Sequence, residues 1–405
     1  MSNLCGFVLH LLRFCLATIR GFVLFGAMAS VVALFYLWGI TMANAKLSEA
    51  KNAKNDEFYT QYEDIQREIN AYLEYDPDVF RGKTVLLPCD DPEWSNFTRF
   101  FAQNFENFGL KKLISTSYAF ESKHLTSLGY QLSFFEEQSP QFDADKTKTH
   151  GKIFTLTRDS NQSGVIDIDD LEWRYLEGDG DFRSDEVKTL RDEADIIVTN
   201  PPFSLFREFL AWIVEAKKDF VVIGSMNAIT YKEIFPLIKD NKMWLGNGFN
   251  GGNAYFEPFG MSTEGYATGV YDKKTGLVKF RNCCWFTNLE HGRRHQPLQL
   301  MTMADNLKFS RHKEIKENGY QKYDNYDAIE IPFTDAIPSD YDGVMGVPIS
   351  FLEKYCPEQF EIKGQLNVGC FMDENGWQGS NGKNMLAVGD KTAYKRILIK
   401  KKVSP

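Results

Sequence analysis

The sequence predicts an α/β fold with a mostly parallel sheet, and three observations lead to this class. Short apolar runs at 83–87, 112–115, 195–199 and 220–223 alternate with amphipathic segments, as strands alternate with helices in a parallel sheet. Hydrophobic residues make up 43% and charged residues 25% of the 405 residues, which excludes a disordered or low-complexity chain. After about residue 290 the alternation fades into basic, loop-rich sequence, so we expect a second region there.

The first elements are bounded by clear signals. Residues 46–75 have a helical pattern that ends at Asp76-Pro77, and Pro88 stops the strand expected at 83–87. An amphipathic helix is expected at 97–108. Residues 136–152 and 158–170 are polar and are expected to be loops or insertions.

The later elements follow the same alternation. The helix expected at 203–217 directly follows the strand expected at 195–199. In open α/β sheets, ligands bind beyond the carboxyl ends of the strands. The motifs described below follow strands in this way, and they predict a site at that edge.

Residues 1–43 form an apolar segment that differs from the rest. No charged residue occurs from Gly21 to Ala45, a run long enough to cross a bilayer as a helix. Arg13 and Arg20 precede it and favour a cytoplasmic N-terminus. The expected organisation is therefore this segment, a catalytic domain at 44–290, and a recognition region at 291–405.

Three interpretations of the apolar segment stay open. It is an inner-membrane anchor through residues 21–43, a signal peptide with a small-residue site at Ala43-Asn44-Ala45, or translated sequence upstream of a natural start at Met42. The third is favoured because the chemistry inferred below needs a cytosolic cofactor. We therefore expect a cytoplasmic protein, with a membrane partner only if residues 1–43 are genuinely present.

Charge and cysteine content narrow the function classes. The net charge is −9, so the chain is no general polyanion binder, and any nucleic-acid contact must come from a local basic patch. The seven cysteines include no CxxC pair and no cysteine/histidine cluster of zinc type. Reduced thiols and no metal site are expected.

The strongest motif is Asn200-Pro201-Pro202-Phe203, which directly follows an apolar strand. Two prolines remove backbone donors and stiffen the turn. The stiff turn can aim the Asn200 amide oxygen and the Pro201 carbonyl at one point, where they would accept both hydrogens of an NH2 group. Phe203 would then stack on the planar ring that carries the amine. We therefore favour methylation of an aromatic amine over an ordinary Asn-Pro turn as the interpretation of this motif.

The motif resembles the fourth motif, (D/N/S)-P-P-(Y/F), of DNA adenine-N6 methyltransferases. Cys89-Asp90-Asp91-Pro92 followed by Ser95-Asn96-Phe97 resembles the EcoRI-type adenine-specific methyltransferase family more closely still. The resemblance covers roughly Ala45 to the C-terminus. It implies a Rossmann-like class I methyltransferase fold, base flipping of the target adenine, and S-adenosyl-L-methionine as cofactor.

The resemblance also implies the cofactor residues. Phe58-Tyr59-Thr60 is similar to a motif near the methionine part of the cofactor, and 178–184 is similar to the third motif, in which an acid bonds the adenine amine and an aromatic ring stacks. The usual glycine-rich loop after the first strand is absent. The expected cofactor residues are Tyr59, Thr60, Cys89, Asp90, Asp91, Asp181 and Phe182.

The expected partner is double-stranded DNA, read by the C-terminal region. The candidate contacts are Arg293, Arg294, Lys308 and Arg311, because cations hold phosphates and arginine reads guanine. In an acidic protein such binding should be sharply salt-dependent. A restriction endonuclease acting separately is compatible with this class, and no obligate protein partner is indicated.

Two alternative functions stay open. Motifs of this type also serve methylation of RNA bases and of protein amides, so the substrate class is one question. The absence of the usual glycine-rich loop after the first strand would also fit a DNA-binding descendant that has lost catalysis. The basic C-terminal region argues for nucleic acid, and retention of the other motifs argues for activity.

Overall fold

The computed structural model describes residues 58–90, 95–119, 139–160, 162–166, 168–249, 252–258, 269–367 and 369–402. Lys54–Pro405 form one compact unit. Residues 1–43 and Asp91 lie outside the described residues, and so do the expectations made for them. Within the described ranges, no helix is long and apolar enough to cross a membrane.

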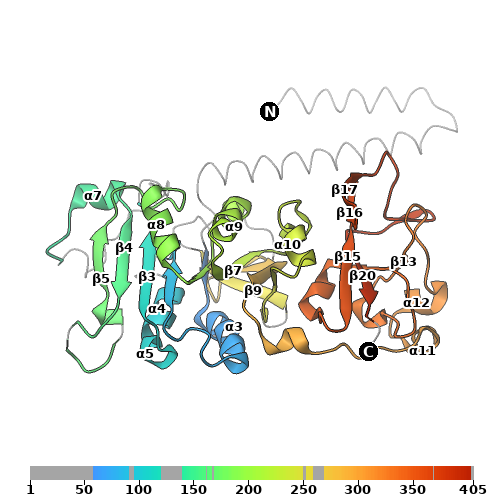
Figure 1. Cartoon of the computed structure of the whole chain (residues 1–405), viewed down its shortest axis with the longest axis horizontal. Helices are drawn as coiled ribbons and strands as arrows, with labels where there is room; N and C mark the ends of the chain where they lie inside the picture. Colours follow the sequence, from blue (N-terminus) through green and yellow to red (C-terminus); the bar gives the residue numbers. More distant parts are fainter. Residues whose placement is uncertain are drawn as a thin grey trace, which may run out of the picture. The chain divides into compact units, whose positions relative to one another are not determined.

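The unit contains an eight-stranded sheet in the order β5-β4-β3-β2-β6-β7-β12-β8. Figure 1 labels β5, β4, β3 and β7 of this sheet. Its strands are β2 (Thr84–Leu87), β3 (Lys112–Ser117), β4 (Lys152–Leu156), β5 (Glu172–Tyr175), β6 (Ile196–Thr199), β7 (Asp219–Ser225), β8 (Trp244–Leu245) and β12 (Cys283–Thr287).

The sheet is mixed, whereas a mostly parallel sheet was expected. The central strands β3, β2, β6 and β7 are parallel to one another. The outer strands β4, β5, β12 and β8 are all paired antiparallel. The difference arises because β4 and β5, which flank the polar stretch 158–170 and were not expected as strands, pair as an antiparallel hairpin. In addition, β12, which follows β8 in the chain, pairs antiparallel with β7.

Helices cover both faces of this sheet, which explains why its central strands are continuous apolar runs. Successive residues of β2 enter different cores: Val85 and Leu87 pack on one face and Leu86 on the other. The first face is covered by α3 (Tyr62–Tyr75), α4 (Asn96–Gln103) and α5 (Phe105–Phe108), and the second by α8 (Asp185–Glu193) and α9 (Phe206–Glu215).

Local signals set the ends of these helices. The Ser95 hydroxyl accepts a hydrogen bond from the Phe97 amide at the start of α4, and Ser184 caps α8 in the same way. The single helix expected at 97–108 is divided at Asn104 into α4 and α5. Gly109 then adopts a left-handed φ of 63°, which ends α5.

A second sheet has four strands in the order β1-β9-β11-β10. They are β1 (Phe58–Thr60), β9 (Asn253–Pro258), β10 (Tyr271–Asp272) and β11 (Leu277–Arg281). Strand β1 pairs antiparallel with β9, so the start of the described chain lies against a segment almost 200 residues later. This pairing places the Phe58-Tyr59-Thr60 motif beside Phe256–Pro258.

The C-terminal region contains a six-stranded sheet in the order β13-β14-β20-β15-β16-β17 and a two-stranded sheet, β18-β19. The strands are β13 (Ile329–Glu330), β14 (Met345–Pro348), β15 (Phe360–Leu366), β16 (Cys370–Asp373), β17 (Gly376–Gly379), β18 (Ala387–Val388), β19 (Lys391–Thr392) and β20 (Arg396–Lys401). Met345, Phe360 and Ile397 share one core with Phe206 of α9 and Phe286 of β12. The described residues before and after residue 290 are therefore joined by a shared core.

Short helices connect these elements. The α-helices are α7 (Ala144–Thr149), α10 (Phe235–Lys239), α11 (Met303–Phe309) and α12 (Lys313–Asn318). The 3-10 helices are η2 (Ile168–Asp170), η3 (Phe203–Leu205), η4 (Met226–Thr230), η6 (Gly292–His295), η7 (Thr334–Ala336) and η8 (Ile349–Lys354). Helix α7 lies within the polar stretch 136–152 that was expected to be loop.

Candidate active site

The site begins where β6 ends, at the carboxyl edge of the central sheet. Asn200 follows Thr199 directly, and its side-chain Oδ1 is buried. Pro201 and Pro202 are buried, and Phe203 starts η3. The parallel strands β2, β3 and β7 end at the same edge, so polar groups that follow them converge there.

Asp90 lies in the loop that follows β2, called the first loop below, and connects this loop to the 200–203 motif. Its buried carboxylate accepts hydrogen bonds from Ser95 Oγ at 2.7 Å and from Thr199 Oγ1 at 2.6 Å. Its backbone amide donates to the carbonyl of Thr116 on β3 at 3.1 Å. One carboxylate therefore connects the end of β2, the start of α4 and the last residue of β6.

The FYT strand is tied to the same place. Asn96 Nδ2 donates to the Thr60 carbonyl at 2.8 Å, which links β1 to the start of α4. Thr60 itself is buried, and its Oγ1 has no hydrogen-bond partner among the described residues. A buried polar atom without a partner is costly, so this position suits a ligand that supplies one.

Phe203 stands in an aromatic cluster with the second sheet. Its ring meets Phe256 edge-on at 6.3 Å and Phe280 at 5.9 Å between centroids. Phe256 is the register partner of Thr60 across β1 and β9. The structure therefore brings the Phe58–Thr60 strand, Asp90 with the start of α4, and the 200–203 motif together, although more than 100 residues separate the first from the last.

Helix α9 lies unusually close to β7 just after the motif. A Cβ at Gly224 would overlap the Phe206 ring, which begins α9. The Phe206 ring also contacts Phe286 at a centroid distance of 5.1 Å. Glycine at 224 thus permits the packing that fixes where the motif leaves the sheet.

The loop expected to be the third motif lies against the end of β3. The Ala119 amide donates to the Asp179 carbonyl at 2.8 Å. The Asp181 carboxylate accepts from Arg183 Nε at 2.9 Å, and Arg183 Nη1 also reaches Glu208 on α9 at 3.3 Å. The hydrogen bonds that Arg183 donates to Asp181 raise the pKa of Arg183, so the guanidinium stays charged beside Asp181.

Phe182 lies in the core, which differs from the expectation of a ring open to the cofactor. It is 1% exposed and meets Phe209 and Trp212 of α9 edge-on at 5.2 and 5.7 Å. No local sequence pattern indicates that α9, the helix after β6, covers this ring. Cys89 is partly buried and packs against the same core.

Comparison with known proteins decides the family. Residues 46–402 match the family described as "Adenine-specific methyltransferase EcoRI". The chain belongs to this family. It is 40% identical over 361 residues to the type II methyltransferase M.EcoRI of Escherichia coli, which covers 89% of this chain and 97% of the relative.

Two further relatives of this methyltransferase come from mycoplasmas. The type II methyltransferase M.MpnI of Mycoplasma pneumoniae is 34% identical, with 88% of this chain and 98% of the relative covered. M.MgeORF184P of Mycoplasma genitalium is 33% identical, with 87% and 98% covered. No solved structure matches the chain.

Arg294, expected to contact DNA, is buried inside the methyltransferase. Its guanidinium lies over the Trp244 ring at 3.8 Å, its Nε is 3.0 Å from Glu290 Oε2, and its Nη2 donates to Asn241 Oδ1. The side chain is only 3% exposed. This corrects the expectation: the cation is held by its own protein, and it ties η6 to the catalytic sheet.

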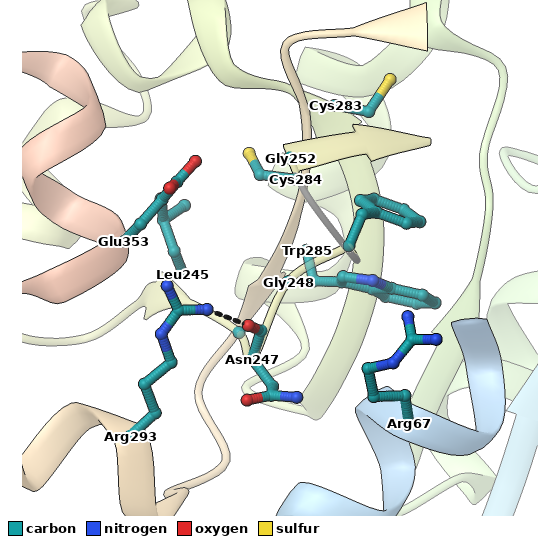
Figure 2. Close-up of a pocket in the computed structure, with 12 residues that line it drawn as sticks. Arg67, Leu245, Asn247, Gly248, Gly252, Cys283, Cys284, Trp285, Arg293 and Glu353 are labelled. Carbon is teal, nitrogen blue, oxygen red and sulfur yellow. Dashed lines mark hydrogen bonds between the residues drawn. The ribbon is translucent and has the colours of Figure 1, made fainter. Parts of the chain in front are cut away.

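Arg293 lines a cavity of about 410 Å³ beside the loop that follows β8. Figure 2 shows Arg293 and Glu353 on one side of this cavity, Arg67 on the other and Asn247 between them. Arg293 Nη1 donates to the Asn247 carbonyl. Arg293 is therefore partly buried on the wall of this cavity, and the expectation that it contacts DNA stays a prediction.

A buried acid holds that loop from the opposite side. Glu68 accepts hydrogen bonds from the amides of Asn247 and Gly248 at 2.9 and 2.8 Å and from the Tyr72 hydroxyl at 2.5 Å. Burial raises the pKa of Glu68, and these donors oppose the shift. Burial also raises the pKa of Cys283, on the cavity wall, to about 12, so its thiol is protonated at neutral pH and a poor nucleophile.

Lys308 and Arg311 lie on the surface, as a DNA contact requires. Lys308 is at the end of α11, with its Nζ 4.9 Å from the centroid of the exposed Phe309 ring. Arg311 is 79% exposed and pairs with Asp335 at 2.9 Å. Neither is brought near the 200–203 motif by any contact that the structure describes.

Sequence reasoning missed Thr199, and it gave Asn96 no role of its own although Asn96 belongs to the recognised 95–97 motif. Thr199 is the last residue of a buried strand, and Asn96 begins a helix. A polar residue at the carboxyl end of an apolar strand is the signal that could have found Thr199. Among the described residues, no group of histidine, cysteine, aspartate and glutamate could hold a metal ion.

Proposed function

We propose that this chain, an adenine-specific DNA methyltransferase, transfers a methyl group to N6 of a flipped-out adenine within a short duplex recognition site. One observation carries the proposal: Asp90 and Phe256 join the 200–203 motif to the first loop and to the FYT strand. Because its relatives are named type II methyltransferases, we propose that it is the modification arm of a restriction–modification system or a solitary relative of one. A cognate nuclease would act separately.

Asn200 and Pro201 would orient the target amine. The amide oxygen and the carbonyl accept its two hydrogens, so the nitrogen lone pair is turned toward the methyl donor. Phe203, already edge-on to Phe256 and Phe280, would stack on the extruded base. No strong base is needed because the proton can leave after the methyl group arrives.

S-adenosyl-L-methionine, when bound, supplies the methyl group. The residues fit this cofactor because Thr60 offers a buried hydroxyl without a partner among the described residues, beside Tyr59 on β1. Asp181 and the 89–91 segment are the other proposed cofactor contacts. Asp90 already accepts two side-chain hydrogen bonds, so we propose that it positions the other cofactor residues. Phe182 supports them from the core.

The C-terminal region would hold the duplex. Lys308 and Arg311 are the surface cations proposed from the sequence for phosphate contact, whereas Arg294 is assigned to structure. A cytoplasmic location is proposed, since both the cofactor and chromosomal DNA are found there. Incubating the full chain with unmethylated genomic DNA and the cofactor, followed by modification-sensitive sequencing, tests the function; modified adenine at no recurrent site would overturn it.

The Asn200→Ala variant tests the assigned chemistry. We expect a loss of turnover of at least about 100-fold, because two acceptors position the amine and one is removed. Cofactor affinity, measured by calorimetry, should change less than about twofold. Asn318→Ala, at an exposed asparagine at the end of α12, is the control and should retain full activity. Equal loss of turnover and cofactor affinity in Asn200→Ala would contradict the assignment.

A further inference from the structure

Three cations near the carboxyl edge each lie over an aromatic ring. The Arg207 guanidinium is 5.2 Å from the Tyr231 ring centroid, Lys232 Nζ is 5.9 Å from that of Trp377, and Lys395 Nζ is 5.9 Å from that of Tyr394. We call this set the cation–aromatic strip; it comprises Arg207, Tyr231, Lys232, Trp377, Tyr394 and Lys395.

The strip is continuous across two parts of the molecule. Its centre is the segment 230–232, which follows β7 through η4. On one side Tyr231 meets Arg207 of α9, and on the other Lys395 Nζ donates to Thr230 Oγ1 at 2.8 Å. Gln365 of β15 also donates to the Thr230 carbonyl at 3.3 Å. The strip therefore joins the catalytic sheet to the six-stranded sheet.

The strip lies at the same edge as the 200–203 motif. Arg207 is the second residue of α9, four residues after Phe203. The segment 230–232 follows β7, which is parallel to β6 and paired with it. Both parts of the strip therefore leave the carboxyl edge of the sheet beside Asn200.

The charges of the strip are not neutralised by the protein. Within the described ranges, Arg207, Lys232 and Lys395 form no ion pair with a carboxylate, whereas Arg294 and Arg311 each do. Glu208, next to Arg207, pairs with Arg183. Glu233 is the exposed acid on the same segment as Lys232. An aromatic ring orients a cation and leaves its charge available to another anion.

We propose that the cation–aromatic strip binds the phosphodiester backbone of duplex DNA and so positions the duplex over Asn200. The inference rests on the proposed function and adds the surface by which this acidic protein holds its substrate. Arg207 and Lys232, both exposed, neutralise phosphates. Tyr231 and Tyr394, 36% and 62% exposed, offer flat faces to the sugars. Contacts of this kind act on every sequence and leave site selection to other residues.

The test compares two double variants. Arg207→Gln/Lys232→Gln removes two charges from the strip. Lys111→Gln/Lys217→Gln removes two exposed lysines that form no ion pair within the described ranges and precede β3 and β7, at the opposite edge of the sheet. Binding of the full-length chain to a fluorescent duplex of mixed sequence is measured by anisotropy over a salt series. Each lost phosphate contact lowers the slope of log affinity against log salt by about 0.9.

The strip variant should therefore show a slope smaller by about 1.8 and an affinity loss between 50 and 200 mM salt about tenfold smaller than wild type. Cofactor affinity and the unfolding midpoint should be unchanged, and Arg207→Lys/Lys232→Arg should restore binding. The control pair should follow the wild-type curve.

Two results would overturn the inference while leaving the proposed function intact. In one, the wild type binds and methylates DNA, and the strip variant has the wild-type slope. In the other, the control pair loses as much as the strip variant, which means that net charge alone is responsible. A wild-type chain that neither binds duplex nor methylates genomic DNA would instead refute the proposed function itself.

Discussion

A single buried carboxylate connects the motifs of the site. From the sequence, Asp90 and its neighbour Asp91 are both expected to be cofactor residues, and nothing distinguishes the two acids. In the structure its two oxygens accept from Ser95 and from Thr199, two residues far apart in the chain. Hydrogen bonds to a charged group contribute about 1.5–3 kcal/mol each. The position of Asn200, one residue after Thr199, therefore depends on Asp90.

The Thr199→Val variant removes one of these hydrogen bonds with little change of shape. We expect the free energy of unfolding to fall by about 1–3 kcal/mol, because the buried carboxylate loses a donor. Cofactor affinity should weaken as well, since the first loop loses its anchor on β6. Chemical denaturation and calorimetry measure the two effects.

Thr155→Val provides the matched control on β4, where the side chain is only partly buried. Its free energy of unfolding should change by less than about 0.5 kcal/mol. If Thr199→Val behaves like this control in both measurements, Asp90 does not connect the two motifs in solution.

Among the elements, the contact of α9 with β7 determines how the chain leaves the 200–203 motif. Helix α9 is predicted by its amphipathic pattern, and its start is set by close packing of Phe206 on Gly224. The pattern also predicted strands β2, β3, β6 and β7. It did not predict the β4–β5 hairpin: the four residues of β5 alternate between exposed and half-buried as strand residues do, but the run is too short to be decisive by itself.

The Gly224→Ala variant should push α9 away from β7. An added methyl group in a tightly packed core costs about 1–3 kcal/mol, and we expect that loss of stability in denaturant unfolding. Methylation should slow as well, because the motif is attached to the displaced helix. Gly379→Ala is the control, since a Cβ there meets no heavy atom within 4 Å. Equal stability of the two variants would show that α9 does not pack as described.

On the scale of the whole molecule, the six-stranded sheet is joined to the eight-stranded sheet by a shared core, and the segment between them is held by buried polar groups. His291, 2% exposed, contacts the Leu245 carbonyl through Nε2 at 3.0 Å. Burial lowers its pKa to about 4, and the positive charges of Arg294 and Arg293 add to the shift. The imidazole is therefore neutral in the folded protein at neutral pH.

The stability of the whole molecule should depend on pH through His291. Its folded pKa lies below the unfolded value of about 6.5, so the unfolded chain takes up a proton first as pH falls. The contribution is fully present above about pH 6.5 and is lost toward pH 4, by roughly 3 kcal/mol for a shift of this size. Unfolding of His291→Gln, measured over this range, should lack that part of the slope.

The His150→Gln variant, which alters a histidine hydrogen-bonded to Thr149 at the end of α7, should keep the wild-type pH dependence. Parallel curves for wild type and His291→Gln would contradict the assignment of a buried neutral imidazole. The comparison concerns the slope, so a uniform loss of stability in either variant does not affect it.

Apolar periodicity and short motifs are local properties of the chain, so they were enough to predict the α/β class, the central parallel strands, the 200–203 motif and the family. Which side chains are available to ligands depends instead on how the chain packs. Arg294 and Phe182 look like a DNA contact and a stacking ring, yet both are buried by segments distant in sequence. The same packing placed Arg207 and Lys232 together with Lys395 at the carboxyl edge. Burial and charge pairing depend on residues brought together from the whole chain, and no local pattern contains them.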